Sequence, residues 1–487
     1  MAPVELPADP FTLGVASGDA SAAAVVLWTR LAPDPLAGGG MPSDDIEVMW
    51  EVARDEAFDE VVTSGVELAR ATHGHSLHVR AALDEGWWFY RFRVGGYTSP
   101  IGRTRRAPSA TTPTDEVRFA SANCQNYQNG FYTAHRDIAE QQPDFVVWLG
   151  DYIYEGASRP VDGNDVVRSH DGTEEVRTLE QYRNRYALYR SDPDLRAAHG
   201  TCPWYVIWDD HEVENNYAGL VPELPDESAG FDERRRIAYQ AWWEHMPVDL
   251  APPDDSGEFR IYRDFRWGSL LDLALLDGRQ YRTDQACGDV TLNLEPACPE
   301  TFAEDRTMLG TEQEAWLLDT LGSESPALWN VIGNQTVFGD LMLGEAVLNY
   351  DQWDGYPKQR NRILEQLAAR QVDNVVVLTG DIHFAGTGNL RLGERGTGTP
   401  VGVEFVATSI SSGGNVNPAV TDVLISFPDI VDVELEHRGY ILHTVTPQRW
   451  RADYRMVETV KTEGAAMYTH AVYAVDVGTN TVYAQTS

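Results

Sequence analysis

The sequence predicts an α/β domain in which helices cover the faces of a sheet, preceded by a small all-β sandwich. Strand signals dominate residues 9–107, whereas from about residue 116 short apolar runs alternate with amphipathic stretches. Such alternation is typical of α/β domains. The chain has 487 residues, of which 43% are hydrophobic and 10% aromatic, so it is long enough for more than one domain with a large core.

The first hundred residues are rich in β-branched and aromatic side chains. The segments VVLWTRL, DIEVMWEVA and WWFYRFRVGG cluster or alternate these residue types and are separated by turn-forming residues. The stretch RTRRAPSATTPT that follows is interpreted as a linker. We therefore expect an N-terminal β-sandwich domain of residues 9–107, a linker of residues 108–115 and a second domain of residues 116–487.

The second part of the chain carries helix signals between its apolar runs. Five segments have the periodicity of amphipathic helices, namely 134–142, 179–190, 233–246, 312–321 and 362–371. From about residue 440 the pattern returns to strand signals, as in GYILHTVTP and THAVYAVDV. The helices are expected to cover the sheet that the apolar runs form.

The charge of the chain and the motifs that it lacks argue against several classes of function. The formal net charge is −37, and such an acidic surface repels the phosphate backbone of nucleic acids. The two lysines, Lys358 and Lys461, do not lie in a P-loop motif. The segment GVASG has its serine in the wrong place for a nucleophile elbow, and no apolar run approaches the roughly 18 residues of a membrane-spanning helix.

Four cysteines give an indication of the compartment. Cys287 and Cys298 lie close together in a polar loop, which favours a local disulfide and therefore export from the reducing cytosol. Cys202 begins an apolar run and is interpreted as an inert core thiol. The sequence does not begin with a charged-then-apolar leader, and the start Met1-Ala2-Pro3 is interpreted as an expression start on a mature protein. A secreted, periplasmic or extracellular location is expected.

Polar residues follow several of the apolar runs at the point where each run ends. In open α/β sheets, ligands bind at the carboxyl edge of the strands, so these residues are expected to share one site. They are Cys124 after VRFASAN, Asp151 and Tyr154 after DFVVWLG, Asp209, Asp210 and His211 after WYVIW, Asn334 after LWNVIG, and Asp381 and His383 after NVVVLTG.

The chemistry of these residues suggests two kinds of metal ion. The thiol of Cys124, the phenol of Tyr154 and the imidazole of His383 suit a Lewis-acidic transition metal. Because a phenol loses its proton near pH ~10, trivalent iron is the ion acidic enough to bind it. The carboxylates of Asp151 and Asp381, with that of Asp210, suit hard cations such as calcium or magnesium.

An ordered set of motifs covers nearly the whole chain. It comprises DPFTLGVASGDASAAAVVLWTRL (9–31), SANCQ (121–125), GDYIYE (150–155), WDDHEVENNYAG (208–219), DGRQYR (277–282), LGTEQEAWLL (309–318), GNQ (333–335) and GDIHF (380–384). With these motifs the chain resembles the PhoD-like alkaline phosphatase/phosphodiesterase family, which is related to the purple acid phosphatases within the calcineurin-like metallophosphoesterases. The resemblance implies a catalytic domain of two sheets flanked by helices, after an N-terminal β-sandwich of the PhoD type.

The resemblance also implies roles for residues of this chain. Fe³⁺ would be held by Cys124, Asp151, Tyr154 and His383, and Ca²⁺ by Asp151, Asp210 and Asp381. His211 would contact the phosphoryl group and protonate the leaving alkoxide. Asp209, Asn216 and Asn334 are further candidates for contacting the substrate or supporting the ligands. The family's usual Asp-Thr-Arg is here Asp277, Gly278 and Arg279, so the role of that turn stays open.

Three functions are compatible with the sequence. The first is hydrolysis of phosphomonoesters and phosphodiesters by a metal-activated hydroxide. The second is a phospholipase D-type reaction that releases a phospholipid head group, with transient contact to a membrane surface. The third is a secreted binding protein with an inactive catalytic half, which the intact ligand set argues against. The expected partner is a small-molecule or lipid phosphate ester and not a nucleic acid. The number of calcium ions and the oligomeric state stay open.

Overall fold

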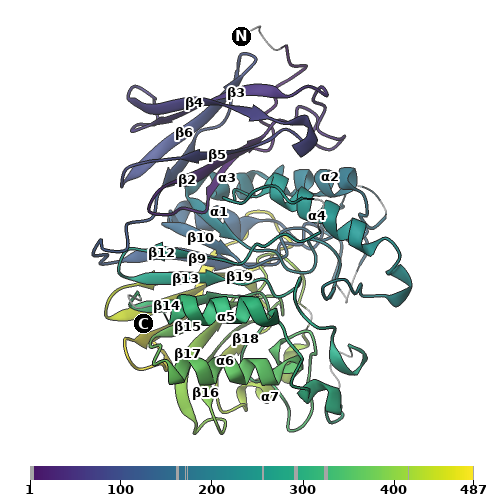
Figure 1. The fold of residues 1–487 in the computed structure, drawn as a ribbon, viewed down its shortest axis with the longest axis vertical. Coiled ribbons are helices and arrows are strands. Elements are labelled where there is room, and N and C mark those ends of the chain that lie inside the picture. Colours follow the sequence, from purple (N-terminus) through teal and green to yellow (C-terminus); the bar gives the residue numbers. More distant parts are fainter. Residues whose placement is uncertain are drawn as a thin grey trace.

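The computed structural model describes residues 5–160, 164–170, 172, 174–254, 257–289, 294–322, 327–414 and 416–485. Two large mixed sheets stack face to face with helices on their outer faces, and a smaller sheet lies at one end of the molecule (Figure 1). The expected α/β architecture of two sheets flanked by helices is therefore confirmed.

The first large sheet has ten strands in the order β22-β21-β20-β19-β9-β10-β11-β1-β2-β5. Its central strands β9, β10, β11 and β1 run parallel, and their neighbours are antiparallel. The strands are β1 (Val15–Gly18), β2 (Val25–Arg30), β5 (Ser76–Ala81), β9 (Val117–Ala122), β10 (Phe145–Trp148), β11 (Pro203–Val206), β19 (Arg438–Val445), β20 (Arg449–Val457), β21 (Met467–Asp476) and β22 (Val482–Ala484).

The second large sheet has seven strands in the order β12-β13-β14-β15-β17-β16-β18, of which β13, β14, β15 and β17 are parallel. They are β12 (Arg263–Trp267), β13 (Leu271–Leu275), β14 (Trp329–Gly333), β15 (Val375–Thr379), β16 (Ala385–Leu392), β17 (Thr399–Val406) and β18 (Ile430–Glu434). Every residue of β15 is buried, as its β-branched run requires, because a helical layer covers one face and the ten-stranded sheet covers the other.

The main core lies between the two large sheets and is rich in aromatic rings. The ring centroids of Phe145 and Trp267 are 4.7 Å apart, and those of Trp329 and Trp450 are 5.7 Å apart. Each of these pairs joins one sheet to the other. Burying such large apolar surfaces fixes the relative position of the two sheets, and therefore of the loops at their edges.

The helices cover the outer faces of the sheets. Leu317 and Leu321 of α5 and Ile363 and Leu367 of α6 are buried on the seven-stranded sheet. The five expected helices are confirmed as α1, α2, α4, α5 and α6, whereas α3 and α7 were not predicted. Their bounds are α1 (Thr133–Gln141), α2 (Leu179–Arg190), α3 (Pro193–Thr201), α4 (Phe231–His245), α5 (Gly310–Leu321), α6 (Pro357–Ala369) and α7 (Thr421–Ile425). None of the described helices has both the length and the apolar character needed to span a membrane.

The N-terminal stretch contributes strands to two sheets. The smaller sheet has five strands, namely β3 (Ile46–Ala53), β4 (Val61–Ala69), β6 (Trp87–Val94), β7 (Tyr97–Thr98) and β8 (Gly102–Arg105). In contrast, β1, β2 and β5 extend the ten-stranded sheet, because β1 pairs in parallel with β11. Residues 106–116 contain neither helix nor strand. The division of the chain into domains at residues 108–115 stays a prediction.

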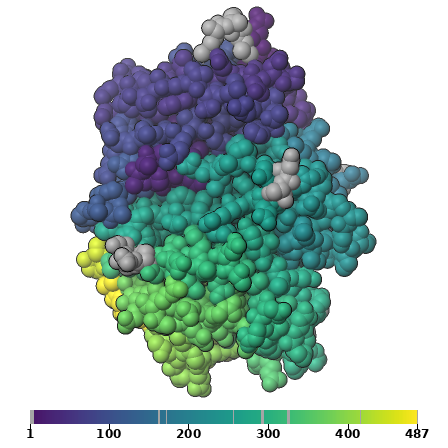
Figure 2. All heavy atoms as spheres, in the orientation of Figure 1, coloured from purple at the N-terminus to yellow at the C-terminus, as the bar shows by residue number. Residues whose placement is uncertain are grey.

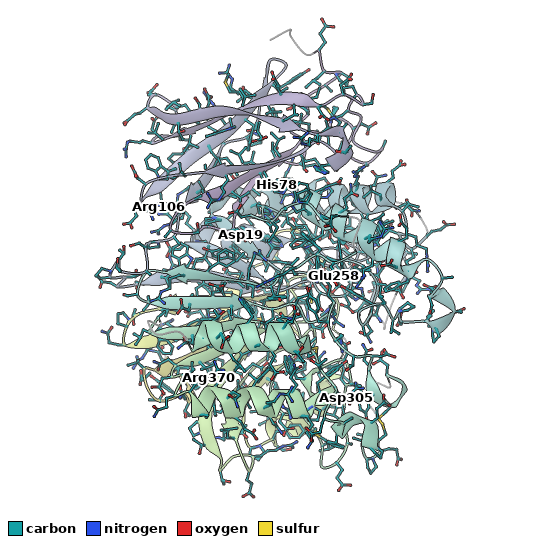
Figure 3. All side chains as sticks on the ribbon, in the orientation of Figure 1. Asp19, His78, Arg106, Glu258, Asp305 and Arg370 are labelled. Atoms are coloured by element: carbon teal, nitrogen blue, oxygen red, sulfur yellow. A yellow bond between two sulfur atoms is a disulfide. The ribbon has the colours of Figure 1, made fainter. Side chains whose placement is uncertain are left out.

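Polar and aromatic contacts fasten this N-terminal part to the rest of the chain. The carboxylate of Asp19 pairs with the Arg263 guanidinium at 2.7 Å, and the ring of His78 stacks on that of Trp243 with centroids 4.2 Å apart. Figure 3 shows Asp19 and His78 where the N-terminal part meets the rest of the molecule. In the space-filling view the N-terminal part (purple) contacts the middle of the chain (teal) across the width of the molecule (Figure 2). These contacts hold the N-terminal part against α4 and β12.

Candidate metal centre

The predicted site residues come together at the carboxyl edge of the parallel strands. Cys124 follows β9, Asp151 and Tyr154 follow β10, Asp210 follows β11, and Asp381 and His383 follow β15. Their ligand atoms form three overlapping groups in which all atoms lie within 4.8 Å of one another: Cys124, Asp151 and His383; Asp151, Asp210 and His211; and Asp209, Asp210 and Asp381. Asp151 and Asp210 are thus shared between neighbouring groups.

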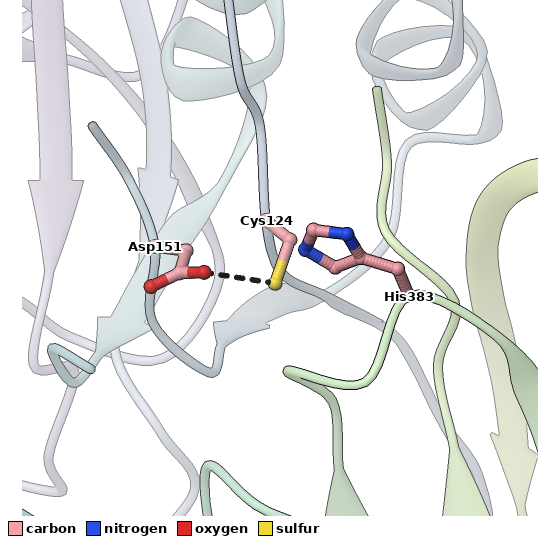
Figure 4. A group of neighbouring side chains, drawn as sticks. All are labelled: Cys124, Asp151 and His383. Atoms are coloured by element: carbon pink, nitrogen blue, oxygen red, sulfur yellow. Dashed lines mark hydrogen bonds between the residues drawn. The ribbon is translucent and has the colours of Figure 1, made fainter. Parts of the chain in front are cut away.

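The phenol of Tyr154 joins the sulfur, carboxylate and imidazole of the first group. The Cys124 thiol donates to Asp151 Oδ2 at 3.3 Å, and the Tyr154 hydroxyl donates to the same oxygen at 2.8 Å. Tyr154 Oη also lies 3.0 Å from His383 Nε2 and 2.9 Å from the hydroxyl oxygen of Ser412. Cys124, Asp151 and His383 point toward one another from three separate loops (Figure 4).

The third group, Asp209, Asp210 and Asp381, consists of carboxylates around a buried guanidinium. Arg279 pairs with Asp209 through Nε and with Asp351 through both terminal nitrogens at 2.8 and 2.9 Å. Its Nη2 lies 3.6 Å from Asp210 Oδ1 and 3.9 Å from Asp381 Oδ1. Arg279 belongs to the turn of residues 277–279, whose role the sequence left open. Its guanidinium supplies the positive charge that holds these carboxylates together.

The backbone at these positions adopts a conformation that side chains rarely tolerate. The φ angle is 55° at Cys124, 56° at Asp151, 63° at Asp381 and 59° at His383. Non-glycine residues in this left-handed region store strain, which tertiary contacts must offset, and such strain is concentrated at functional sites. The local geometry thus aims four predicted ligands at one point.

The two Gly-Asp pairs have a steric explanation. A Cβ added to Gly380 would lie 2.3 Å from Asn123 Cγ, and one added to Gly150 would lie 2.5 Å from Asp209 Cβ. Only glycine allows the loop that follows each strand to approach its neighbour this closely. Each Gly-Asp pair therefore places its aspartate, Asp151 or Asp381, directly after a glycine that packs closely against a neighbouring loop.

Burial makes the charged forms of these acids unfavourable in the absence of a cation. Burial and the nearby Asp151 charge raise the pKa of the Cys124 thiol well above its ordinary value. Burial also raises the pKa of Asp151, which the charge of His211 offsets only in part, and the pKa of Tyr154. Burial and the charge of Asp351 raise the pKa of Asp381 to about 6. Bound cations would reverse these shifts.

His211 forms a pair with Glu155 at the open side of the site. Its Nδ1 lies 2.7 Å from Glu155 Oε2, and its ring is tilted by 32° to that of Tyr154 with centroids 4.1 Å apart. Burial alone lowers the pKa of His211, but the charges of Glu155, Asp151 and Asp210 outweigh it and raise that pKa well above its ordinary value. In the absence of a bound cation, these carboxylates therefore favour the imidazolium over the neutral ring.

The residues present fit a group of bound cations. The Oδ1 atoms of Asp151, Asp210 and Asn334 are buried and have no hydrogen-bond partner among the described residues. Unpartnered buried oxygens are costly unless something binds them, and carboxylate and amide oxygens are the ligands that hard cations prefer. The thiol, phenol and imidazole of the first group suit a transition metal instead.

The other predicted residues lie nearby with distinct partners. The Asn216 backbone N–H donates to Asp210 Oδ2 at 2.6 Å, and the Asn334 amide donates to the Thr336 carbonyl at 2.5 Å. Asp209 faces Arg279, so its carboxylate is already neutralised within the protein. The disulfide between Cys287 and Cys298 is confirmed. Cys202 is a buried free thiol, as expected.

The sequence did not assign several residues that support the site. Glu212 accepts from the backbone N–H groups of Asp151 and Asp209 at 3.1 and 2.7 Å, and so ties the end of β10 to that of β11. Gln352 donates to Asp381. Glu155 and Glu212 lie inside quoted motifs and could have been assigned, whereas nothing local to Gln352 or Asp351 marks them.

A cleft with a volume of about 370 Å³ opens beside the site. Tyr154, His211 and His383 line it, together with glutamates and amide side chains. A cleft of this size accommodates a small ester beside the ligand cluster.

Comparison with known proteins gives a consistent result over the whole chain. Residues 119–454 match the model of the PhoD-like phosphatase family, and residues 2–108 match that of the PhoD-like phosphatase N-terminal domain. The chain is 45% identical to alkaline phosphatase D of Bacillus subtilis (strain 168) over 473 residues, which are 95% of this chain and 80% of the relative.

Solved structures show the same likeness. A structure described as that of PhoD superposes with a TM-score of 0.95 at 43% identity and covers 99% of this chain and 94% of its own. The purple acid phosphatase PPD1 from yellow lupin (Lupinus luteus) seeds superposes with a TM-score of 0.55 at 12% identity, over 97% of this chain and 75% of its own. This second likeness shows the fold alone.

Proposed function

Because the chain belongs to the PhoD-like phosphatase family, we propose that it hydrolyses phosphate monoesters and diesters at the metal centre described above. The observation that carries this function is the overlap of three ligand groups at one edge of the two sheets, with Asp151 and Asp210 shared between them. Such shared carboxylates suit neighbouring ions, and neighbouring ions clamp the attacking and leaving oxygens of a phosphoryl group.

We propose Fe³⁺ for the first group together with Tyr154, and Ca²⁺ for the carboxylates beside it. The ligands for iron would be Cys124, Asp151, Tyr154 and His383, which include the phenol that trivalent iron binds. The ligands for calcium would be Asp151, Asp210 and Asp381. The Oδ1 atoms of Asp151 and Asp210, which accept no hydrogen bond from the described residues, support this assignment. Such ions supply a water molecule of lowered pKa and offset negative charge on the phosphoryl group.

The residues of the chain orient the ester and move the proton. With Nδ1 directed to Glu155, the Nε2–H of the His211 imidazolium is available to a phosphoryl oxygen or to the leaving alkoxide. Glu155 fixes the orientation of the ring and stabilises its charge. Asn216 and Asn334 are proposed to contact the substrate or support the ligands, since Asn334 Oδ1 is buried without a partner among the described residues.

The Asp151→Asn variant tests this function. We expect it to lose both bound metal and esterase activity, because the carboxylate is shared by two ligand groups. Metal content is measured by elemental analysis and by the visible absorption of ferric thiolate or phenolate. Asp319→Asn, whose side chain is exposed on α5, is the control and should behave as the wild type. Full iron content with full turnover in Asp151→Asn would contradict the proposal.

The finer assignments need a panel of substrates. Release of choline from phosphatidylcholine, compared with hydrolysis of 4-nitrophenyl phosphate and its diester, tests the phospholipase D-type alternative and with it transient membrane contact. Each reaction is run with calcium and with chelator. We also propose that the protein is exported, which the disulfide supports, because such bonds persist in oxidising compartments.

A further inference from the structure

An arginine lies at the mouth of the catalytic cleft. Arg159 lines the same cleft as Tyr154, His211 and His383, and of the described lining residues it is the only arginine or lysine. It is exposed, whereas His211 is half-buried and Tyr154 is buried, so its position is nearer to solvent. The guanidinium therefore lies where the part of an ester remote from the phosphoryl group leaves the cleft.

The loop that carries Arg159 is fixed to the metal centre. It continues directly from Asp151, Tyr154 and Glu155, and Arg185 donates to the Gly156 carbonyl at 3.0 Å. The backbone N–H of Arg159 donates to Gln128 Oε1 at 3.2 Å. The backbone of residue 159 is thus held in place relative to the ligands, while the residue is exposed to solvent.

The guanidinium of Arg159 has no partner within the described part of the chain. Every other arginine there has a side-chain hydrogen bond, an ion pair or a ring contact, even those without an acidic partner, such as Arg118, Arg196, Arg103 and Arg260. In a chain with 75 acidic and 38 basic residues, an unpaired arginine is unexpected.

The acids of the cleft are already engaged with other groups. Glu155 contacts His211, Glu214 pairs with Arg234, and Glu223 accepts from Asn215. Since Arg159 pairs with none of them, it is available to an anion entering from solvent. A planar guanidinium binds phosphate and carboxylate oxygens through two parallel hydrogen bonds.

We propose that Arg159 is a specificity residue that binds a second anionic group, a phosphate or a carboxylate, on the organic part of the ester. This inference rests on the proposed function, because the first anionic group is the phosphoryl group beside His211. Two kinds of substrate offer the second charge: monoesters of an alcohol that bears a carboxylate, and diesters whose next phosphate lies one unit along the molecule.

Two matched substrate pairs test the inference. The first is 4-carboxyphenyl phosphate against its neutral isostere, 4-carbamoylphenyl phosphate. The second is thymidine 5′-(4-nitrophenyl phosphate) with and without a 3′-phosphate. Each is assayed with the metal-loaded wild type, Arg159→Gln, Arg159→Lys and the control Arg54→Gln. Arg54 is exposed in the N-terminal part, so its loss changes the net charge equally without touching the cleft.

We expect Arg159→Gln to lower kcat/KM roughly tenfold or more, mainly through KM, for the substrate that carries the second anionic group in at least one pair. For the substrate that lacks this group, kcat/KM should stay within about twofold of the wild-type value. Arg159→Lys should lie between, and Arg54→Gln should match the wild type. A response in the first pair identifies the second anionic group as a carboxylate, and a response in the second pair identifies it as a phosphate. Equal effects on both members of both pairs, or no effect on any, would overturn the inference while leaving the proposed function intact. Hydrolysis of no substrate by the wild type would overturn the proposed function as well.

Discussion

Arg279 is the residue whose replacement tests the electrostatic account of the site most directly. It is fully buried, and its guanidinium pairs with Asp209 and Asp351 while lying within 3.6 and 3.9 Å of Asp210 and Asp381. Arg279→Gln removes the charge and leaves the carboxylates buried. Breaking a buried ion pair from one side costs about 3–5 kcal/mol, because the remaining charge is uncompensated.

Two further variants separate charge from packing. Arg279→Lys keeps the charge but cannot reach both acids at once, so roughly 1.5–3 kcal/mol of stability should be lost with the charge-assisted hydrogen bonds. In the double variant Arg279→Gln with Asp209→Asn, a charge leaves from each side. The stability lost in this double variant should be smaller than the summed losses of the two single variants by roughly 0.5–3 kcal/mol. The Asp351 carboxylate retains Arg282 at 3.0 Å in every variant.

The assay is urea unfolding followed by tryptophan fluorescence, with chelator present so that bound ions do not contribute. Arg54→Gln is the control, since an exposed pair such as Arg54 with Glu60 contributes about 0–1 kcal/mol. A loss in Arg279→Gln no larger than that of the control would refute the reasoning, and so would strict additivity in the double variant.

Two other predictions concern stability. Burial lowers the pKa of His443 to about 3, whereas in the unfolded chain it is near ~6.5, so between these values the unfolded state binds more protons and stability falls as the pH falls. His443→Gln should flatten this decline by up to about 1.4 kcal/mol per pH unit in denaturant titrations, and an unchanged slope would contradict the assignment. Replacing Cys287 and Cys298 together by serine should cost ~2–3 kcal/mol, because their disulfide closes a short loop with a sequence separation of 11, and dithiothreitol should destabilise the wild type but not this variant.

The sequence predicted the ligand edge of the fold because the signal is local. An apolar run predicts a buried strand, and the residue that follows it is then placed at the carboxyl edge, as for Cys124, Asp151 and Asp381. The helix α6 was predicted for the same reason, since its buried apolar residues Ile363, Leu364 and Leu367 repeat with the helical period. The assignment of roles depended further on the resemblance to a family.

The contacts that neutralise the site could not be predicted in this way. Arg279 and Asp351 are 72 positions apart, and no local pattern distinguishes this acid from others in an acidic chain. The left-handed backbone at Cys124 and His383 also leaves no trace in the sequence, because cysteine does not favour that conformation and most histidines do not adopt it. Both features exist only once the two sheets are stacked.

The sharing of a sheet between the N-terminal part and the rest leads to a last prediction. The parallel pairing of β1 with β11 places Ser17 opposite Pro203, and Tyr205 of β11 donates to the Ala20 carbonyl at 2.6 Å. β11 leads into Asp209, Asp210 and His211. Without the N-terminal part, the edge of β11 would be unpaired and apolar surface beside it would be exposed to water.

A protein of residues 108–487 should therefore aggregate or lose its bound metal, although the predicted ligands all lie within it. Size-exclusion chromatography, circular dichroism and elemental analysis measure this, and adding the purified N-terminal fragment in trans provides the control for specific pairing. Recovery of a soluble, metal-loaded and active protein without that fragment would show that residues 116–487 form an independent domain. The pairing of β1 with β11 would then be dispensable for the geometry of Asp210 and His211.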